Sequence, residues 1–125
     1  MEVLAGRVLI HPTDLARSTV FYRDVLGLAV FREFPGGTVF FLGGGYLEVS
    51  GRAAGSTAGG VQLWMQVRDL VAVHGELAAA GVTVLREPRR EPWGLDEMWI
   101  ADPDGLRIVV VEVPPEHPMR RDPRS

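Results

Sequence analysis

An internal repeat constrains the fold of this chain more than any other feature of its sequence. The segment GLAVFRE at residues 27–33 returns as GVTVLRE at residues 81–87, and the triplet TDL at residues 13–15 returns as RDL at residues 68–70. Both halves indicate the same order of elements, a strand, a helix and three more strands. A ferredoxin-like chain could repeat a strand–helix–strand piece by coincidence, but the extra strands argue against it. The repeat therefore predicts two βαβββ units.

The first half supplies clear boundaries for its elements. Residues 7–13 are apolar enough for a strand, and Asp14 is a good N-cap for a helix that starts at Leu15. Gly27 is placed to end this helix as the residue after its C-cap. Three strands are then expected, at residues 28–34, 38–42 and 46–50.

The second half repeats the pattern. A strand is expected at residues 61–67, Asp69 can cap a helix that runs through Ala80, and Gly81 ends that helix. Residues 91–94 form a loop, and residues 102–105 (DPDG) form a tight turn. Three further strands are expected, at residues 82–87, 97–101 and 106–113.

These elements predict a single α+β domain over residues 1–113. Its two βαβββ units, about residues 5–50 and 60–113, are expected to form a curved mixed sheet around a cleft, with the helices on the outer face. The small residues 51–59 are interpreted as a linker between the units. Residues 114–125 are rich in proline and are interpreted as a C-terminal tail.

Composition excludes several classes of function. A net charge of −3 gives no electrostatic reason to expect a nucleic-acid partner, and the absence of cysteine excludes disulfides and thiolate chemistry. No apolar run approaches the roughly 18 residues of a membrane span, and residues 1–10 lack a signal-peptide pattern. We therefore expect a cytoplasmic protein with no membrane partner.

Several motifs carry a family resemblance over about residues 5–113. They are TDLARS at residues 13–18, FYRDVLG at 21–27, PWG at 92–94 and ADPDG at 101–105. In these motifs the chain resembles the vicinal oxygen chelate superfamily, which contains glyoxalases, bleomycin-resistance proteins and dioxygenases. The resemblance implies the fold described above. It specifies function poorly, because this fold hosts isomerases, dioxygenases, epimerases, thiol transferases and drug-sequestering proteins.

The resemblance also implies where a metal would bind. Metal-dependent members place one ligand on each of four strands, and those positions fall here on Arg7, Glu48, Gln62 and Val109. Only Glu48 is a competent ligand, because arginine stays cationic, valine has no donor atom and glutamine is weak. We therefore expect no metal and no other cofactor, with a nonstandard divalent-metal site as the alternative.

Arg7 and Glu48 suggest a different use of the same position. The two side chains are expected to converge and to form an ion pair inside the cleft, because unpaired charges there would be costly. Such a pair could clamp a ligand carboxylate or amine. It could equally be a structural salt bridge that fills the vacated metal position.

Strand alternation extends the set of cleft-facing candidates. His11 could act as a general base, or it could be held by a hydrogen bond near the end of its strand. Trp64 could stack on a flat ligand or belong to the core, and the register of Trp99 is open. His117 is expected to be solvated in the tail. The full ligand-binding set is Arg7, His11, Tyr46, Glu48, Gln62, Trp64, Trp93 and Arg107.

The leading hypothesis is a metal-free protein that sequesters or carries a hydrophobic or aromatic small molecule. The alternative is an enzyme of lyase, isomerase or dioxygenase type. It would use His11 or Glu48 as its base, or a nonstandard metal site. The resemblance also implies a homodimer, because paired units in this superfamily usually associate.

Overall fold

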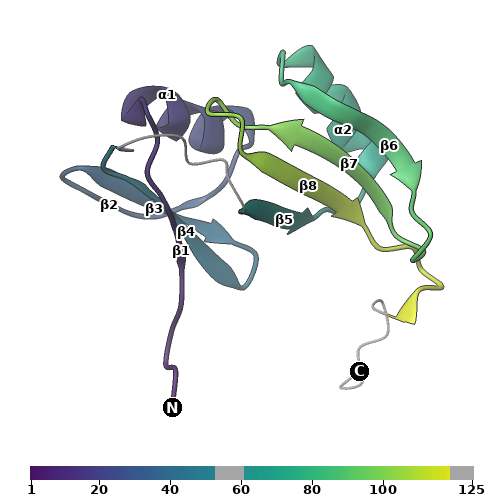
Figure 1. Ribbon diagram of the computed structural model, residues 1–125, viewed down its shortest axis with the longest axis horizontal. Coiled ribbons are helices and arrows are strands. Elements are labelled where there is room, and N and C mark those ends of the chain that lie inside the picture. Colours follow the sequence, from purple (N-terminus) through teal and green to yellow (C-terminus); the bar gives the residue numbers. More distant parts are fainter. Residues whose placement is uncertain (53–60, 119–125) are drawn as a thin grey trace. The chain divides into compact units, whose positions relative to one another are not determined.

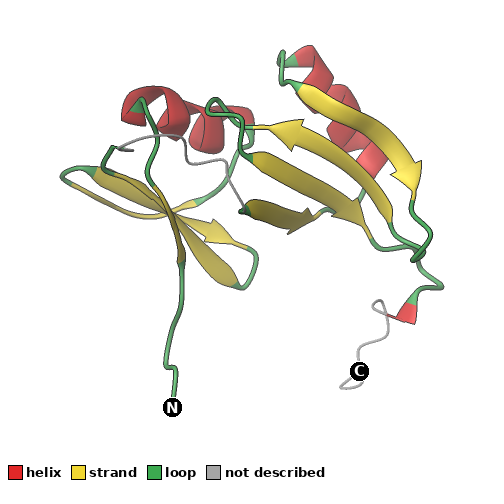
Figure 2. Ribbon diagram, viewed as in Figure 1, coloured by secondary structure: helices red, strands yellow, loops and turns green. Residues whose placement is uncertain are grey.

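The computed structural model describes residues 1–52 and 61–118. The first part contains β1 (Val8–Ile10), α1 (Leu15–Val20), η1 (Phe21–Val25), β2 (Val30–Phe34), β3 (Gly37–Leu42) and β4 (Gly45–Ser50) (Figures 1 and 2). The second part contains β5 (Gln62–Gln66), α2 (Leu70–Ala79), β6 (Val84–Arg90), β7 (Asp96–Ala101) and β8 (Arg107–Glu112).

Each part folds into a four-stranded mixed sheet with the same topology. The first sheet has the order β1-β4-β3-β2 and the second has the equivalent order β5-β8-β7-β6. The first strand of each unit runs parallel to the last one, and all other neighbours are antiparallel. The expected α+β fold with two βαβββ units is therefore confirmed.

The helix boundaries follow the capping residues that recur in the sequence. Asp14 accepts a hydrogen bond from the Arg17 amide at 3.0 Å, and Asp69 accepts one from the Ala72 amide at 3.1 Å. Gly27 and Gly81 follow the two helices with φ angles of 72° and 77°, in the left-handed region that favours glycine.

The first helix departs from expectation after Val20, where it widens into the π-helical turn η1. The Leu26 amide bonds to the Phe21 carbonyl at 2.8 Å, five residues back. Phe21 and Tyr22 are both buried beside this turn. Ordinary helical periodicity does not predict a wider turn of this kind.

In the first unit the two faces of the sheet have different surroundings. Tyr22 of η1 packs against Phe40 of β3, with ring centroids 6.3 Å apart, so Phe40 points toward the helical layer. Its cross-strand partner Leu47 shares that face and is fully buried. The neighbouring residues Val39 and Phe41 point to the opposite face, which we call the open face of the first sheet.

The second unit has the same two-sided arrangement. Helix α2 packs against β6 and β8. Met98, Ile100 and Ile108 are fully buried, and they alternate along their strands with Trp99 and Val109. The helix therefore covers the first set, and Trp99 and Val109 point to the open face of the second sheet.

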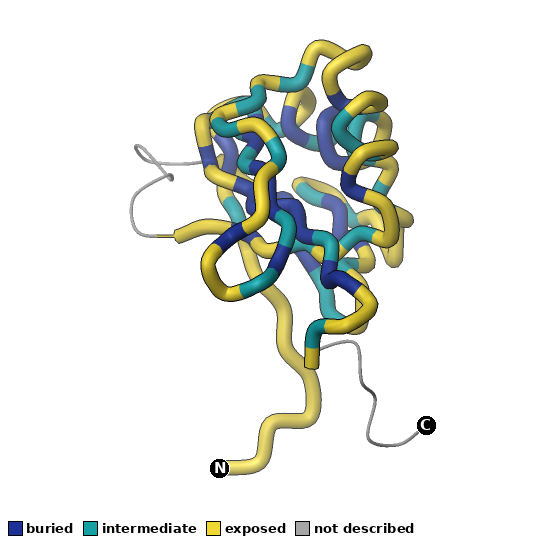
Figure 3. The backbone as a smooth tube through the Cα atoms, turned by 90° about the vertical axis from the view of Figure 1, so that its right-hand side faces the viewer, coloured by how far each residue is buried: buried dark blue, intermediate teal, exposed yellow. Residues whose placement is uncertain are grey.

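The two compact units do not divide the chain at a single point. The first unit comprises Met1–Val61 together with Pro103–Leu106, and the second comprises the remainder. The turn segment joins the first unit through Asp104, which accepts hydrogen bonds from the amide and the hydroxyl of Thr13. Residues 1–9 are exposed throughout (Figure 3).

Two segments named from the sequence extend beyond what the structure describes. The linker at 51–59 lies almost wholly outside the described residues, as does the end of the tail from residue 119. Within the tail, Pro114 is buried and His117 Nε2 lies 3.0 Å from the carbonyl oxygen of Trp93. His117 is thus held against the second unit, although the sequence suggested a solvated side chain. Across residues 1–52 and 61–118, no helix is long and apolar enough to cross a membrane.

Candidate functional site

A polar cluster occupies the open face of the first sheet at the junction of β1 and β4. Arg7 Nη1 donates to Glu48 Oε1 at 2.9 Å, and the Ser50 hydroxyl donates to Glu48 Oε2 at 2.8 Å. The Ser50 hydroxyl, followed by the Arg7 guanidinium, holds the pKa of Glu48 below its usual range. Glu48 is therefore a stable carboxylate and a weak base.

The Arg7–Glu48 pair is less buried than its position in the sequence suggested. The Arg7 side chain keeps 37% of its surface exposed and the Glu48 side chain keeps 14%. Water or a ligand can therefore reach the guanidinium. This geometry brings the two residues together as expected, but it does not place the pair inside a sealed core.

His11 lies at the end of β1, beside the same cluster. Its Nδ1 atom is 2.8 Å from the carbonyl oxygen of Ser50. Because a carbonyl oxygen can only accept, Nδ1 carries the proton and Nε2 is left as the acceptor in the neutral ring. This hydrogen bond is the one considered in the structural alternative for His11, and a role as general base stays a prediction.

Three aromatic rings continue the open face of the first sheet. The Phe31 ring centroid lies 4.8 Å from that of Tyr46 and 5.2 Å from that of Phe41, and Phe41 lies 5.7 Å from Tyr46. Phe31 is 45% exposed and Phe41 is 41% exposed. We call these three residues the aromatic cluster. It gives this face an apolar surface that water contacts directly.

Of these three residues, the sequence pattern indicates Tyr46 but not its two partners. Phe41 is the cross-strand partner of Tyr46, and alternation from the Gly43–Gly45 turn could have found it. Phe31 could not be found in this way, because a register shift between Val30 and Arg32 breaks the alternation of β2.

The open face of the second sheet is organised around Trp99. The guanidinium carbon of Arg86 lies 4.0 Å from the Trp99 ring centroid, and that of Arg107 lies 4.2 Å from it. Trp64 stands opposite Val109 on the neighbouring strand and is 45% exposed. This face therefore presents indole rings and a guanidinium side by side.

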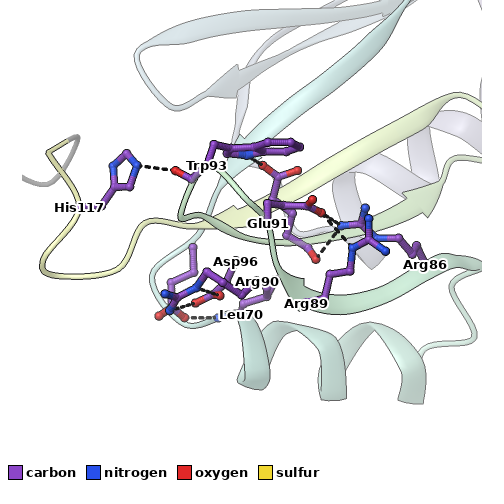
Figure 4. Close-up of polar contacts among 10 residues, drawn as sticks. Leu70, Arg86, Arg89, Arg90, Glu91, Trp93, Asp96 and His117 are labelled. Atoms are coloured by element: carbon purple, nitrogen blue, oxygen red, sulfur yellow. Dashed lines mark hydrogen bonds and ion pairs between the residues drawn. The ribbon is translucent and has the colours of Figure 1, made fainter.

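The buried carboxylate of Glu91 holds the guanidinium of Arg86 in place (Figure 4). Glu91, only 4% exposed, pairs with Arg86 and also receives Arg89 Nε at 3.4 Å. The Trp93 indole donates to Glu97 Oε2 at 2.8 Å. The sequence placed Trp93 as a ligand contact in a loop and did not point to the two glutamates, because register shifts in β6 break the alternation that would orient their partners.

The four positions implied by the metal-dependent proteins do not form a suitable donor set. Glu48 is already engaged by a cation and a hydroxyl, and Arg7 repels a metal ion. Gln62 stands opposite Arg107, and Val109 packs in an apolar cluster against Trp99. Among the described residues, no three His, Asp or Glu side chains gather in a way that could hold a metal ion.

A family model covers most of the chain. The model for the glyoxalase/bleomycin resistance protein/dioxygenase superfamily matches residues 5–110. The chain belongs to this superfamily. The match confirms the resemblance that the sequence motifs at residues 13–27 and 92–105 indicate. No curated protein sequence matches the chain.

Solved structures share the fold of this chain. A glyoxalase-related enzyme from Fulvimarina pelagi is 25% identical, with a TM-score of 0.72 over 90% of this chain and 88% of its own. A glyoxalase/bleomycin resistance protein/dioxygenase from Nocardioides is 18% identical, with a TM-score of 0.75 over 94% and 89%. TioX from Micromonospora sp. ML1 is 22% identical, with a TM-score of 0.71 over 87% and 95%.

Within this superfamily fold, the sequence-predicted residues fall into two groups. Arg7, His11, Tyr46 and Glu48 share the open face of the first sheet, whereas Gln62, Trp64 and Arg107 share that of the second. Trp93 lies in the loop before β7. The structure thus gathers the candidates on two sheet faces, and their roles in binding remain predictions.

Proposed function

We propose that this chain binds a hydrophobic, partly aromatic small molecule without a metal ion, and that it sequesters or carries that molecule. The observation that supports this most is the aromatic cluster of Phe31, Phe41 and Tyr46. It is exposed to water on the same sheet face as the Arg7–Glu48 pair. Apolar rings beside a few placed polar groups are typical of small-molecule sites.

The chemistry of Glu48 supports binding in preference to metal catalysis. A metal ion bound to Glu48 would lie close to the Arg7 guanidinium, whose positive charge repels it. Arg7 supplies the positive charge that a metal would otherwise bring. In the proposed complex it would contact a polar atom of the ligand, and the aromatic cluster would cover the apolar part.

The proposal can be tested by titration with 2-naphthamide, a neutral bicyclic aromatic amide. Binding is followed by the chemical shifts of the backbone amides of β3 and β4 in metal-free buffer. We expect saturable shifts in wild-type protein and clearly weaker affinity in Phe41→Ala. The matched control is Val71→Ala, which removes an exposed apolar side chain from α2 and should leave affinity unchanged. Equal affinity of all three proteins would place the site elsewhere.

An enzyme of isomerase or lyase type is the second candidate, and the geometry of His11 is the observation that favours it. Its Nδ1 proton is fixed on the Ser50 carbonyl, so Nε2 could act as a general base. Glu48 is a poor candidate for that role because its pKa is lowered. Product formation from a bound ligand, lost in His11→Gln while binding persists, would support this alternative.

We further propose that the chain forms a homodimer. Among the residues that the structure describes, β1 is an edge strand that pairs with β4 alone, and its side chains Val8 and Leu9 are 41% and 50% exposed. An exposed apolar edge is the kind of surface that association covers.

A further inference from the structure

We propose that the open face of the second sheet binds an aromatic carboxylate, and that Arg107 anchors its acidic group. This inference goes beyond the proposed function, because it assigns a binding face within the second unit itself. It is carried by three features of the second sheet: the way Arg107 is held, its lack of a carboxylate partner, and its uncharged neighbours.

A cation–π contact with Trp99 holds the guanidinium of Arg107. Its guanidinium carbon lies 4.2 Å from the Trp99 ring centroid, while that of Arg86 lies 4.0 Å from the same centroid. The N–H donors of a guanidinium lie in the plane of the group and form a fork. Contact with Trp99 restricts the motion of this fork, which lowers the entropy that binding would cost.

Arg107 differs from the other arginines on the strands of this sheet. Arg86 and Arg89 both pair with Glu91, and Arg90 pairs with Asp96 at 2.6 Å. Within residues 1–52 and 61–118, no carboxylate pairs with Arg107. Carboxylates therefore neutralise the arginines of β6, whereas the positive charge of Arg107 on β8 is not neutralised by an ion pair.

The neighbours of Arg107 across the sheet suit an incoming anion. Its Cα partners are Gln62 on β5 and Ala101 on β7, and neither carries a charge. Gln62 is exposed, and its amide group can donate a further hydrogen bond. A carboxylate would then meet a cation and an amide donor. The planar fork of arginine matches the two oxygens of a carboxylate.

The aromatic part of the ligand is inferred from Trp64. Gln62 and Trp64 are two residues apart on β5 and point to the same face, so Trp64 is the diagonal neighbour of Arg107. Strand spacing puts their Cα atoms roughly 8 Å apart. The indole is 45% exposed, and no other described aromatic ring stacks on it. A flat ring joined to a carboxylate can cover this indole while its acid group reaches Arg107.

The test compares 2-naphthoate with 2-naphthamide, which has the same shape but no charge. The three tryptophan indole N–H signals are assigned by single Trp→Phe variants and followed during titration of the full chain at neutral pH. We expect the acid to bind about tenfold more tightly than the amide, because a hydrogen bond to a charged group is worth more than a neutral one. We also expect the Trp64 and Trp99 signals to shift in both titrations.

The variant Arg107→Gln should abolish this preference, so that the acid and the amide bind with equal affinity. A dispersed backbone amide spectrum like that of wild-type protein shows that the variant is folded. The matched control Arg68→Gln removes the same charge from an exposed position before α2, and it should retain the tenfold preference. Arg107→Lys should keep only part of it, because lysine lacks the planar fork.

The outcomes separate this inference from the proposed function. If acid and amide bind wild-type protein equally well, or if Arg107→Gln keeps the preference, Arg107 is no anion anchor although the protein binds aromatic compounds. If neither compound binds, the proposed function fails for this class of ligand, and the anchor fails with it.

Discussion

Glu48 shows how a neighbouring side chain changes the chemistry of a position. Its carboxylate could serve a metal, but Arg7 places a guanidinium 2.9 Å from it. The Ser50 hydroxyl binds the other oxygen at 2.8 Å. Glu48 and Ser50 lie on β4, and Arg7 directly precedes β1, the strand next to β4 in the sheet. The three residues thus create a polar group that a ligand can reach.

Stability of the first unit should depend on the ionisation of Glu48. Its pKa is lowered in the folded protein, so its contribution is present above the usual value of 4.5 and is lost as pH falls below it. Glu48→Gln should therefore lower the free energy of unfolding at neutral pH and have less effect well below pH 4.5. Urea melts at both conditions measure this difference.

The size of the stability loss in Glu48→Gln distinguishes a structural Arg7–Glu48 salt bridge from a ligand clamp. Because Arg7 is 37% exposed, the loss should be small and far from that of a sealed buried pair. Asp24, whose pKa is also lowered, remains in both proteins and cancels in the comparison. A penalty that stays the same at every pH would show that Glu48 does not act through its charge.

Glu91 should matter more to stability, because it is buried and holds two arginines. In Glu91→Ala, Arg86 loses its carboxylate partner while remaining packed on Trp99. We expect a loss of roughly 1–3 kcal/mol in the free energy of unfolding. Glu91→Gln should cost less, because its amide oxygen still accepts a hydrogen bond. Glu76→Ala on the exposed side of α2 is the control, and an equal loss there would contradict the prediction.

Among the elements, those with strong local signals were predicted well from the sequence. Both helix starts follow an aspartate cap, and both ends precede a glycine with positive φ. The ends of the strands differ from the predicted ones by up to three residues, because pairing with neighbouring strands decides where a strand begins and ends. β6, for example, continues through Pro88 to Arg90, which is tolerated because β6 is an edge strand.

The candidate site could be predicted only as far as strand alternation reaches. Alternation placed Arg7, Glu48 and Tyr46 on one face because their strands are regular. The sandwich of Trp99 between Arg86 and Arg107 could not be predicted, because it joins three strands whose relative registers include two shifts. Sequence reasoning left the orientation of Trp99 open for the same reason.

Gly37 should be the least tolerant glycine of the first sheet. A Cβ added there would lie 2.6 Å from Ser50 Cβ, 2.7 Å from Phe34 Cζ and 3.0 Å from the Val49 carbonyl. Gly37→Ala should therefore destabilise the protein by about 1–3 kcal/mol through overpacking. Gly44→Ala is the matched control, because no atom lies within 4 Å of its added Cβ. Thermal melts that give equal shifts for both variants would contradict this packing.

At the scale of the whole molecule, the first expectation is a homodimer. The chain has a mass of 13.7 kDa, and light scattering at micromolar concentration should report about twice that value. Introducing a charge at the exposed edge, as in Val8→Lys, should shift the mass toward the monomer. A wild-type protein that stays monomeric at this concentration would count against the proposal.

The central claim for the whole molecule is that ligand binding needs no metal ion. The most direct measurement is the dissociation constant of 2-naphthamide for protein dialysed against a chelator, before and after one equivalent of Zn²⁺, Ni²⁺, Mn²⁺ or Fe²⁺ is added. Because Arg7 already neutralises Glu48, we expect the same dissociation constant in every sample. Binding that appears only after a metal is restored would contradict the account.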